Sequence, residues 1–332
     1  MSTIKGVEFP IYKPPTHGIL SKLPSSWVPF AELTRLHKPA GTLHAYFPYL
    51  LGILFSDCLT QPSFATSWRQ LLTVKLILYF LVFLLHCVGC TWNDILDREL
   101  DRHVLRCSVR PLARRAISVR AACIFTVAQY AFIFLVVRFA CPQVSLYLIP
   151  VIITGTIYPY TKRFTNWAQG FLGITNALGT LVGCAAAGLD PLTLGSSRSG
   201  MALFCIATSY CVWTLIYDTI YAFQDVQYDK AAGIKTFTLA YEGYTKPVFG
   251  LLAVIQTGFL VAAAGLMDAT WALACGIFCA AILLAIMVAR VDLESPDSCR
   301  WWFQNGGLLF GVILSLALQA ECSSRYFGWP IQ

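Results

Sequence analysis

The sequence predicts an all-α protein that crosses a membrane several times. Hydrophobic residues fill 57% of the 332 positions and charged residues only 12%, whereas a soluble domain carries about 25% charged residues. Long apolar stretches recur along the chain, and none alternates like a barrel strand, so helices are expected to span the bilayer. This composition excludes a disordered, fibrous or ordinary soluble protein.

Nine stretches are long and apolar enough to be spanning helices, which need about 20 residues each. We expect these helices at residues 39–56, 71–91, 117–137, 143–160, 167–188, 201–221, 247–266, 271–290 and 305–321. They form one membrane domain, residues 39–321. A proline-rich arm, residues 1–38, precedes this domain and is expected to be extended on the cytoplasmic face, and a short tail, residues 322–332, follows it.

The basic residues predict the orientation of the helices. Nine spans put the N-terminus and every second loop on one face, and 19 of the 24 Lys and Arg residues fall there. By the positive-inside rule this face is cytoplasmic. No secretory signal is visible, and the first 34 residues contain no Arg, unlike a mitochondrial transit peptide. We therefore expect the endoplasmic reticulum or another endomembrane, with the loops of the site facing the cytoplasm.

Two acidic clusters follow the second and sixth predicted helices. Asp97 and Asp101 lie in the first cluster, Asp225 and Asp229 lie in the second, and the offset between the clusters is 128 residues in both cases. Four spans separate them, so the chain is expected to contain two pseudo-repeated four-helix halves and a ninth helix. Such a repeat places equivalent sites opposite each other.

Each cluster places three carboxylates on one helical face. The predicted metal ligands are Asp94, Asp97, Asp101, Asp218, Asp225 and Asp229. Carboxylates at this density favour a hard cation such as Mg²⁺, which bridges them to substrate phosphates. A single such cluster could instead be a solvated cap paired with neighbouring arginines, but two clusters in register argue against that. The run from His86 to Cys90 is interpreted as part of an apolar helix, not as a zinc site, and the scattered cysteines as packing residues.

Basic residues lie beside both clusters. The predicted diphosphate-binding residues are Arg35, Lys38, Arg106, Arg110, Lys162, Arg163 and Lys235. Acids that hold a metal, next to bases that grip phosphate oxygens, describe a diphosphate site. Arg114, Arg115 and Arg120 are attributed to the positive-inside bias instead.

At these residues the sequence resembles the UbiA-type intramembrane prenyltransferase family. The segment from Asn93 to Asp101 is similar to the first family signature, and the segment from Asp218 to Lys235 is similar to the second. The resemblance implies nine helices around a central cavity, Mg²⁺ and an isoprenyl diphosphate donor. It also implies that Asn93 orients a phosphate or a ligand, and that Tyr158, Tyr221 and Gln224 support the substrate or its cation. Many members carry Asp where His37 stands.

Within the family, the His37–Gly41 start and the proline-rich arm resemble fungal meroterpenoid prenyltransferases, which attach farnesyl to phenolic polyketides. The expected partners are thus an isoprenyl diphosphate, an aromatic phenolic acceptor and the lipid bilayer, with neither nucleic acid nor a protein partner. Three alternatives remain: a 4-hydroxybenzoate polyprenyltransferase of ubiquinone biosynthesis, a membrane-bound terpene cyclase, and a transporter that couples ions through buried acids.

Overall fold

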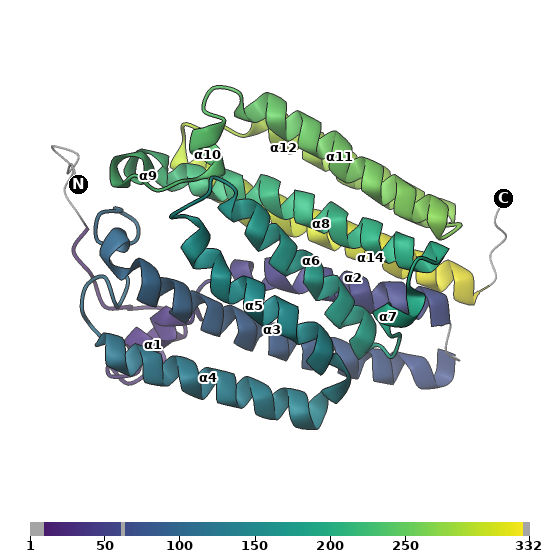
Figure 1. The fold of residues 1–332 in the computed structure, drawn as a ribbon, viewed down its shortest axis with the longest axis horizontal. Coiled ribbons are helices and arrows are strands. Elements are labelled where there is room, and N and C mark those ends of the chain that lie inside the picture. Colours follow the sequence, from purple (N-terminus) through teal and green to yellow (C-terminus); the bar gives the residue numbers. More distant parts are fainter. Residues whose placement is uncertain (1–9, 61–63, 328–332) are drawn as a thin grey trace.

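The computed structural model describes residues 10–60 and 64–327, and these residues form helices and connecting loops without a strand. Figure 1 shows the long helices lying side by side as one bundle, with the short helices α1, α9 and α10 toward one end and α7 toward the other. The all-α class predicted from the sequence is therefore confirmed. Residues 1–9 of the predicted arm and 328–332 of the predicted tail lie outside the described chain.

Each of the nine predicted stretches overlaps a long helix of the described chain, with bounds that differ by at most five residues, except that the second helix extends further at both ends. These helices are α2 (Pro39–Thr60), α3 (Phe64–Asp101), α4 (Val119–Ala140), α5 (Ser145–Thr161), α6 (Ala168–Ala186), α8 (Arg198–Ala222), α11 (Thr245–Leu266), α12 (Trp271–Arg290) and α14 (Gly307–Tyr326). Shorter elements connect them. These are α7 (Pro191–Leu194), η3 (Phe223–Asp225), α9 (Val226–Ala232), α10 (Phe237–Ala240), α13 (Pro296–Trp301), a 3-10 turn (Pro142–Val144) and a π-helical turn (Trp302–Gly306).

Seven helical segments of the described chain are long and apolar enough to cross a membrane. The helices α2 and α6 are not among the seven, so nine spans and the two-half repeat remain predictions. Large apolar side chains such as Ile124 and Val127 of α4 and Val254 of α11 are exposed on the outside of the bundle. Such a surface suits contact with lipid.

The helices α2 and α6 cross at the centre of the bundle with almost no space between their backbones. A Cβ atom at Gly183 would lie 1.9 Å from the carbonyl oxygen of Tyr49, and one at Gly52 would lie 2.0 Å from that of Thr180. Small residues let helix backbones approach this closely in a bilayer. This central position explains why α2 and α6 carry more small and polar residues than a lipid-facing helix.

The N-terminal arm is partly helical, which differs from the predicted extended segment. A 3-10 turn (Leu20–Lys22) and α1 (Val28–Leu33) interrupt it. Glu32 of α1 accepts a hydrogen bond from the hydroxyl of Tyr12 at 2.9 Å and pairs with Arg114 at 2.7 Å. The Arg114 guanidinium also lies 3.6 Å from the centre of the Tyr12 ring. These contacts bind the arm to the loop that follows α3.

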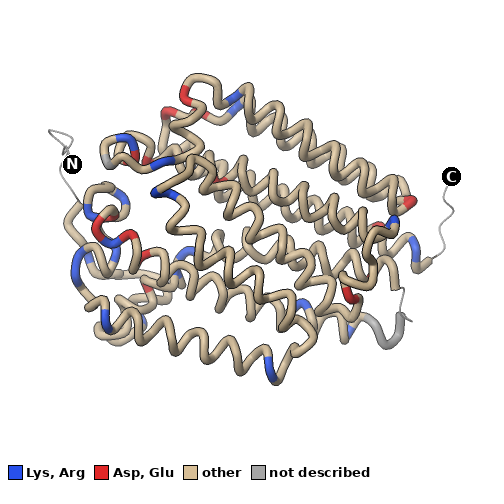
Figure 2. The backbone as a smooth tube through the Cα atoms, viewed as in Figure 1, with Lys and Arg blue, Asp and Glu red and all other residues tan. Residues whose placement is uncertain are grey.

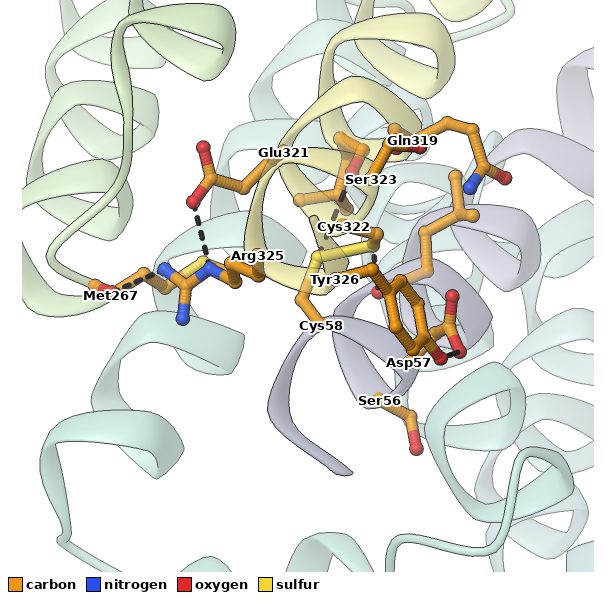
Figure 3. Close-up of a disulfide and its surroundings, with 12 residues drawn as sticks. Ser56, Asp57, Cys58, Met267, Gln319, Glu321, Cys322, Ser323, Arg325 and Tyr326 are labelled. Atoms are coloured by element: carbon orange, nitrogen blue, oxygen red, sulfur yellow. Dashed lines mark hydrogen bonds and ion pairs between the residues drawn. A yellow bond between two sulfur atoms is a disulfide. The ribbon is translucent and has the colours of Figure 1, made fainter. Parts of the chain in front are cut away.

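Charged side chains gather at one end of the bundle, near α1, α9 and α10, and are sparse along the long helices (Figure 2). The opposite end holds a disulfide between Cys58 of α2 and Cys322 of α14 (Figure 3). Beside it, Glu321 is fully buried and pairs with Arg325, which also donates to the carbonyl oxygen of Met267. The disulfide therefore joins the first long helix to the last, at the end away from the acidic motifs.

Candidate active site

A cavity of about 990 Å³ opens among α2, α3, α5, α6 and α8 at the charged end of the bundle. Most of the predicted site residues line it. They are Arg35, Lys38, Asn93, Asp97, Asp101, Arg106, Arg110, Tyr158, Lys162, Asp218, Tyr221, Gln224, Asp225 and Asp229. The tertiary structure thus brings two motifs that are far apart in the sequence to the wall of one cavity. Its volume lies at the upper end of the range for small-molecule sites.

The first acidic motif occupies the last turns of α3. Asp97 accepts a hydrogen bond from the Lys162 ammonium at 2.9 Å, and Asn93 accepts one from the same ammonium at 3.2 Å. Asp101 is the last residue of α3, and both of its carboxylate oxygens lie within 2.9 Å of the Arg110 guanidinium. The loop after α5 therefore supplies one cation to this stripe, and the loop after α3 itself supplies another.

Asp94 lies behind the cavity wall. Its side chain is 0% exposed, and one oxygen accepts from Arg35 at 2.7 Å and from Arg110 at 3.2 Å. The other oxygen, Oδ2, is buried and has no hydrogen-bond partner among the residues described, and the same holds for Oδ1 of Asp97. Arg35 adopts a left-handed backbone with φ of 57°, which is rare for a residue with a side chain. The ion pair with Asp94 helps to hold it there.

The spacing of the second acidic motif predicts one continuous helix, but the structure divides this motif among three elements. The helix α8 ends at Ala222, and Asp225 lies in the 3-10 turn η3, before α9 carries Asp229. Asp218, in α8, still faces the same cavity as the other two. The change of helix type rotates the backbone between Asp218 and Asp225, so their common placement depends on the turn and not on helical periodicity.

Arg106 connects the two motifs. It lies in the loop after the first motif, and its guanidinium grips both carboxylate oxygens of Asp225 in the second. The same guanidinium donates to the hydroxyl of Tyr221 at 2.7 Å and lies 4.9 Å from the centre of that ring. A two-pronged contact of this kind fixes orientation as well as charge.

Arg163 and Lys235 do not line the cavity. Arg163 donates to the carbonyl oxygen of Leu96 at 3.0 Å, and the Lys235 ammonium donates to that of Phe164 at 3.4 Å. The backbone N–H of Lys235 also donates to the carbonyl oxygen of Lys162 at 3.0 Å. Their visible role is to fasten two loops together and so to position Lys162.

The surroundings of the basic residues shift their proton affinities. Burial alone lowers the pKa of Lys162, but attraction to Asp97 and Tyr158 outweighs it, so this pKa lies above its ordinary value. Burial also lowers the pKa of Lys38, and repulsion from Arg35, Arg106 and Arg110 lowers it further, to about 8. Lys162 therefore stays charged at neutral pH, whereas Lys38 can lose its charge at mildly alkaline pH.

Several polar residues of the cavity were not predicted from the sequence. They are Tyr12, Glu32, His44, His86, Cys90, Gln169, Thr175, Thr236, Arg300, Gln304 and Asn305. For His86 and Cys90 the sequence does contain a pattern. They precede Asn93 and Asp97 at successive intervals of four, three and four residues, which places all four on one helical face. Most of the others come from segments without a motif.

Comparison with known proteins places the chain in one family. A profile of the UbiA prenyltransferase family matches residues 47–314. The chain is 31% identical over 249 residues to the prenyltransferase ascA of Acremonium egyptiacum, covering 75% of this chain and 72% of that protein. It is 32% identical over 319 residues to the mitochondrial 4-hydroxybenzoate polyprenyltransferase of Saccharomyces cerevisiae, covering 93% and 80%.

A solved structure has the same fold. The UbiA homolog from Archaeoglobus fulgidus bound to GPP and Mg²⁺ superimposes with a TM-score of 0.60 at 21% identity, over 88% of this chain and 99% of that one. The chain belongs to the UbiA prenyltransferase family, and it is a membrane-bound prenyltransferase.

Proposed function

We propose that this enzyme transfers a farnesyl group from farnesyl diphosphate to a ring carbon of a phenolic polyketide acid, in meroterpenoid secondary metabolism. The observation that carries the proposal is the meeting of both acidic motifs, with Arg106 and Lys162 between them, at the mouth of one cavity. The similarity to fungal prenyltransferases, among them a 4-hydroxybenzoate polyprenyltransferase, supports an aromatic acceptor.

Cationic side chains are assigned to the diphosphate of the donor. Lys38, Arg106, Arg110 and Lys162 line the mouth of the cavity, and all of them except Lys38 now pair with carboxylates. On donor binding these cations turn toward the phosphate oxygens and stabilise the charge that the leaving diphosphate gains. Arg35 remains paired with Asp94, and this pair stabilises the cavity wall next to the four cations.

The residues present fit a magnesium site. The buried oxygens Oδ2 of Asp94 and Oδ1 of Asp97 lack partners among the described residues, and every candidate ligand is a hard carboxylate oxygen. The set proposed to hold Mg²⁺ is Asp94, Asp97, Asp101, Asp218, Asp225 and Asp229. No three of these side chains converge in the described chain, because several of them turn to bases instead. Bound Mg²⁺ supplies positive charge to the departing diphosphate.

The deeper cavity protects the reactive carbon. Heterolysis of the bond between C1 and oxygen leaves both electrons on the diphosphate and an allylic cation on the prenyl group. The ring carbon of the acceptor then bonds to C1, and the ring loses a proton. Apolar wall residues such as Val82, Val151 and Ile152 exclude water that would quench the cation. The electron-rich rings of Tyr158 and Tyr221 line the same space and support the cation.

We place the enzyme in the endoplasmic reticulum or a related membrane, with the charged end facing the cytoplasm. The distribution of Lys and Arg supports this orientation. The Cys58–Cys322 disulfide lies at the opposite end, and disulfides persist in oxidising compartments such as the lumen of the endoplasmic reticulum.

One experiment separates this function from its rivals. Membranes that contain the enzyme are incubated with Mg²⁺ and farnesyl diphosphate, with and without a phenolic polyketide acid, and the products are identified by mass spectrometry. A prenylated phenol supports the proposal, whereas a cyclic hydrocarbon formed without the phenol indicates a terpene cyclase. Transfer to 4-hydroxybenzoate in preference to the polyketide acid indicates the ubiquinone-pathway enzyme. The absence of any product contradicts all three reactions.

A further inference from the structure

A histidine and a cysteine of α3 lie on the cavity wall deeper than the acidic motif. Cys90 precedes Asp94 by four residues and His86 precedes it by eight, which places them about 6 and about 12 Å further along the helix. Both residues line the cavity, and the sulfur of Cys90 lies 3.5 Å from Nε2 of His86. The pair is thus a polar group in the part of the cavity where the prenyl chain and the acceptor must fit.

The first turn of α2 leaves space for this imidazole. A Cβ atom at Gly41 would lie 2.7 Å from Cε1 of His86 and 3.0 Å from its Nε2. The ring therefore rests against bare backbone, and a larger residue at position 41 would displace it. Contact with Gly41 and with the Cys90 sulfur fixes the position of the ring.

Other polar side chains in this part of the cavity already bind each other. Nε2 of His44 is hydrogen-bonded to the carbonyl oxygen of Phe303 at 2.9 Å, and its ring stacks on Tyr217 at 4.5 Å. The amide of Asn176 donates to the hydroxyl groups of Tyr217 and Thr214, at 3.0 and 3.3 Å. These contacts satisfy Nε2 of His44 and the amide nitrogen of Asn176, so neither atom is free to bind a substrate.

The second ring nitrogen, Nδ1, lacks a hydrogen-bond partner in both histidines, within the described part of the chain. Nδ1 of His44 is fully buried, whereas Nδ1 of His86 is not sealed from the cavity that His86 lines. An alkyl chain laid against this nitrogen would leave it without a hydrogen bond, which is unfavourable for a polar atom removed from water. A ligand with a hydroxyl group would satisfy it. The cavity wall is therefore complementary here to a phenol and not to a prenyl tail.

We infer that His86, oriented by Cys90, binds the phenolic hydroxyl of the aromatic acceptor. This inference rests on the proposed function and names the residue that recognises its second substrate. With the proton of the imidazole on Nε2, facing the Cys90 sulfur, Nδ1 accepts the hydrogen bond of the hydroxyl. The oxygen then releases electron density into the ring, whose carbon attacks C1 of the donor.

The test uses farnesyl diphosphate, 2,4-dihydroxy-6-methylbenzoate and the 4-O-methyl ether of that acid. For His86→Ala we expect the KM for the phenol to rise about tenfold while the KM for the donor stays unchanged. The preference for the phenol over its ether should fall toward equality. His86→Asn, whose amide oxygen can replace Nδ1, should restore much of that preference. Cys90→Ala should give the same change to a smaller extent, because Cys90 only positions the imidazole.

Cys87→Ala is the matched control. Cys87 directly follows His86 in α3, but its thiol donates to the carbonyl oxygen of Thr34 and does not line the cavity. It should leave the preference unchanged. An unaltered preference in His86→Ala, or equal losses for both substrates, would overturn the inference.

Equilibrium binding of the phenol to detergent-solubilised enzyme, followed by tryptophan fluorescence, separates this inference from the proposed function. If wild type binds the phenol without turnover and His86→Ala loses that binding, the inference stands and the proposed function fails. If wild type transfers farnesyl and His86→Ala does so with the same preference, the function stands and the inference fails. If wild type neither binds nor prenylates the phenol, both fail.

Discussion

Nε of Arg106 lies 3.2 Å from Oδ1 of Asp225, and this contact joins the loop after the first acidic motif to the turn that carries the second. The two residues are 119 positions apart in the sequence. Because Arg106 also binds Tyr221, one guanidinium holds two side chains of the second motif at the mouth of the cavity. The site is therefore a single charge-compensated assembly and not two separate acidic clusters.

Removing one charge from either motif should abolish transfer. Asp97→Asn and Asp225→Asn would each remove a metal-binding carboxylate and leave Lys162 or Arg106 without its partner. We expect activity to fall on the order of 100-fold or more while the protein still inserts into membranes. Prenyl transfer by isolated membranes with radiolabelled donor measures this. Asp268→Asn, which breaks an exposed pair with Arg198 at the far end, serves as the control. Near-normal turnover in both site variants would contradict the assignment.

Chelation should stop the reaction reversibly. Treatment with EDTA is expected to abolish prenyl transfer, and added Mg²⁺ is expected to restore it, because carboxylate oxygens prefer hard cations. Zn²⁺ should restore less activity than Mg²⁺, since the acidic motifs contain no histidine or cysteine ligand. Full activity in excess EDTA would show that the bases alone stabilise the leaving group.

Donor binding should weaken above about pH 8. Burial and the three neighbouring arginines lower the pKa of Lys38 to about 8, so this side chain is charged below that pH and neutral above it. We therefore expect kcat/KM for the donor to decline as the pH rises through about 8. Lys38→Arg should move this decline to higher pH, because the guanidinium keeps its charge. An identical pH profile in wild type and variant would exclude Lys38 as its origin.

Loss of the Cys58–Cys322 disulfide should reduce stability more than activity. The bond ties α2 to α14 at the end opposite the cavity mouth, and loss of a natural disulfide costs about 2–5 kcal/mol in small domains. The double variant Cys58→Ser/Cys322→Ser should show a lower thermal midpoint in detergent with near-normal turnover at low temperature. Labelling of both thiols by a maleimide in unreduced wild type would show that the bond does not form.

The crossing of α2 and α6 should not tolerate a side chain. In Gly183→Ala the new methyl would overlap the Tyr49 carbonyl, so the helices must separate, and overpacking costs about 1–3 kcal/mol. We expect a lower thermal midpoint and a lower yield of folded protein. Gly258→Ala in α11, where no other atom lies within 4 Å, is the matched control and should be neutral or slightly stabilising. Equal midpoints for the two variants would refute the packing argument.

Most of the site residues predicted from the sequence line the cavity. The acidic motifs, Arg106, Arg110 and Lys162 could be found because carboxylates and bases are rare in so apolar a chain, and all except Asp94 line the cavity. The Cys58–Cys322 pair could not be found, because only the fold brings residues 264 positions apart together. Arg163 and Lys235 were grouped with the site by their proximity in sequence, but their side chains point to backbone carbonyls.

The sequence by itself determined the all-α membrane class and the two acidic motifs, because apolar length and the cost of charge in lipid act on local composition. The packing of the helices places Asp94 behind the cavity wall and Asp225 in a 3-10 turn. It also places His86 on the cavity wall, next to Gly41. These features depend on how helices distant in sequence pack against each other. No local pattern encodes such packing, because each contact requires the whole bundle to be assembled.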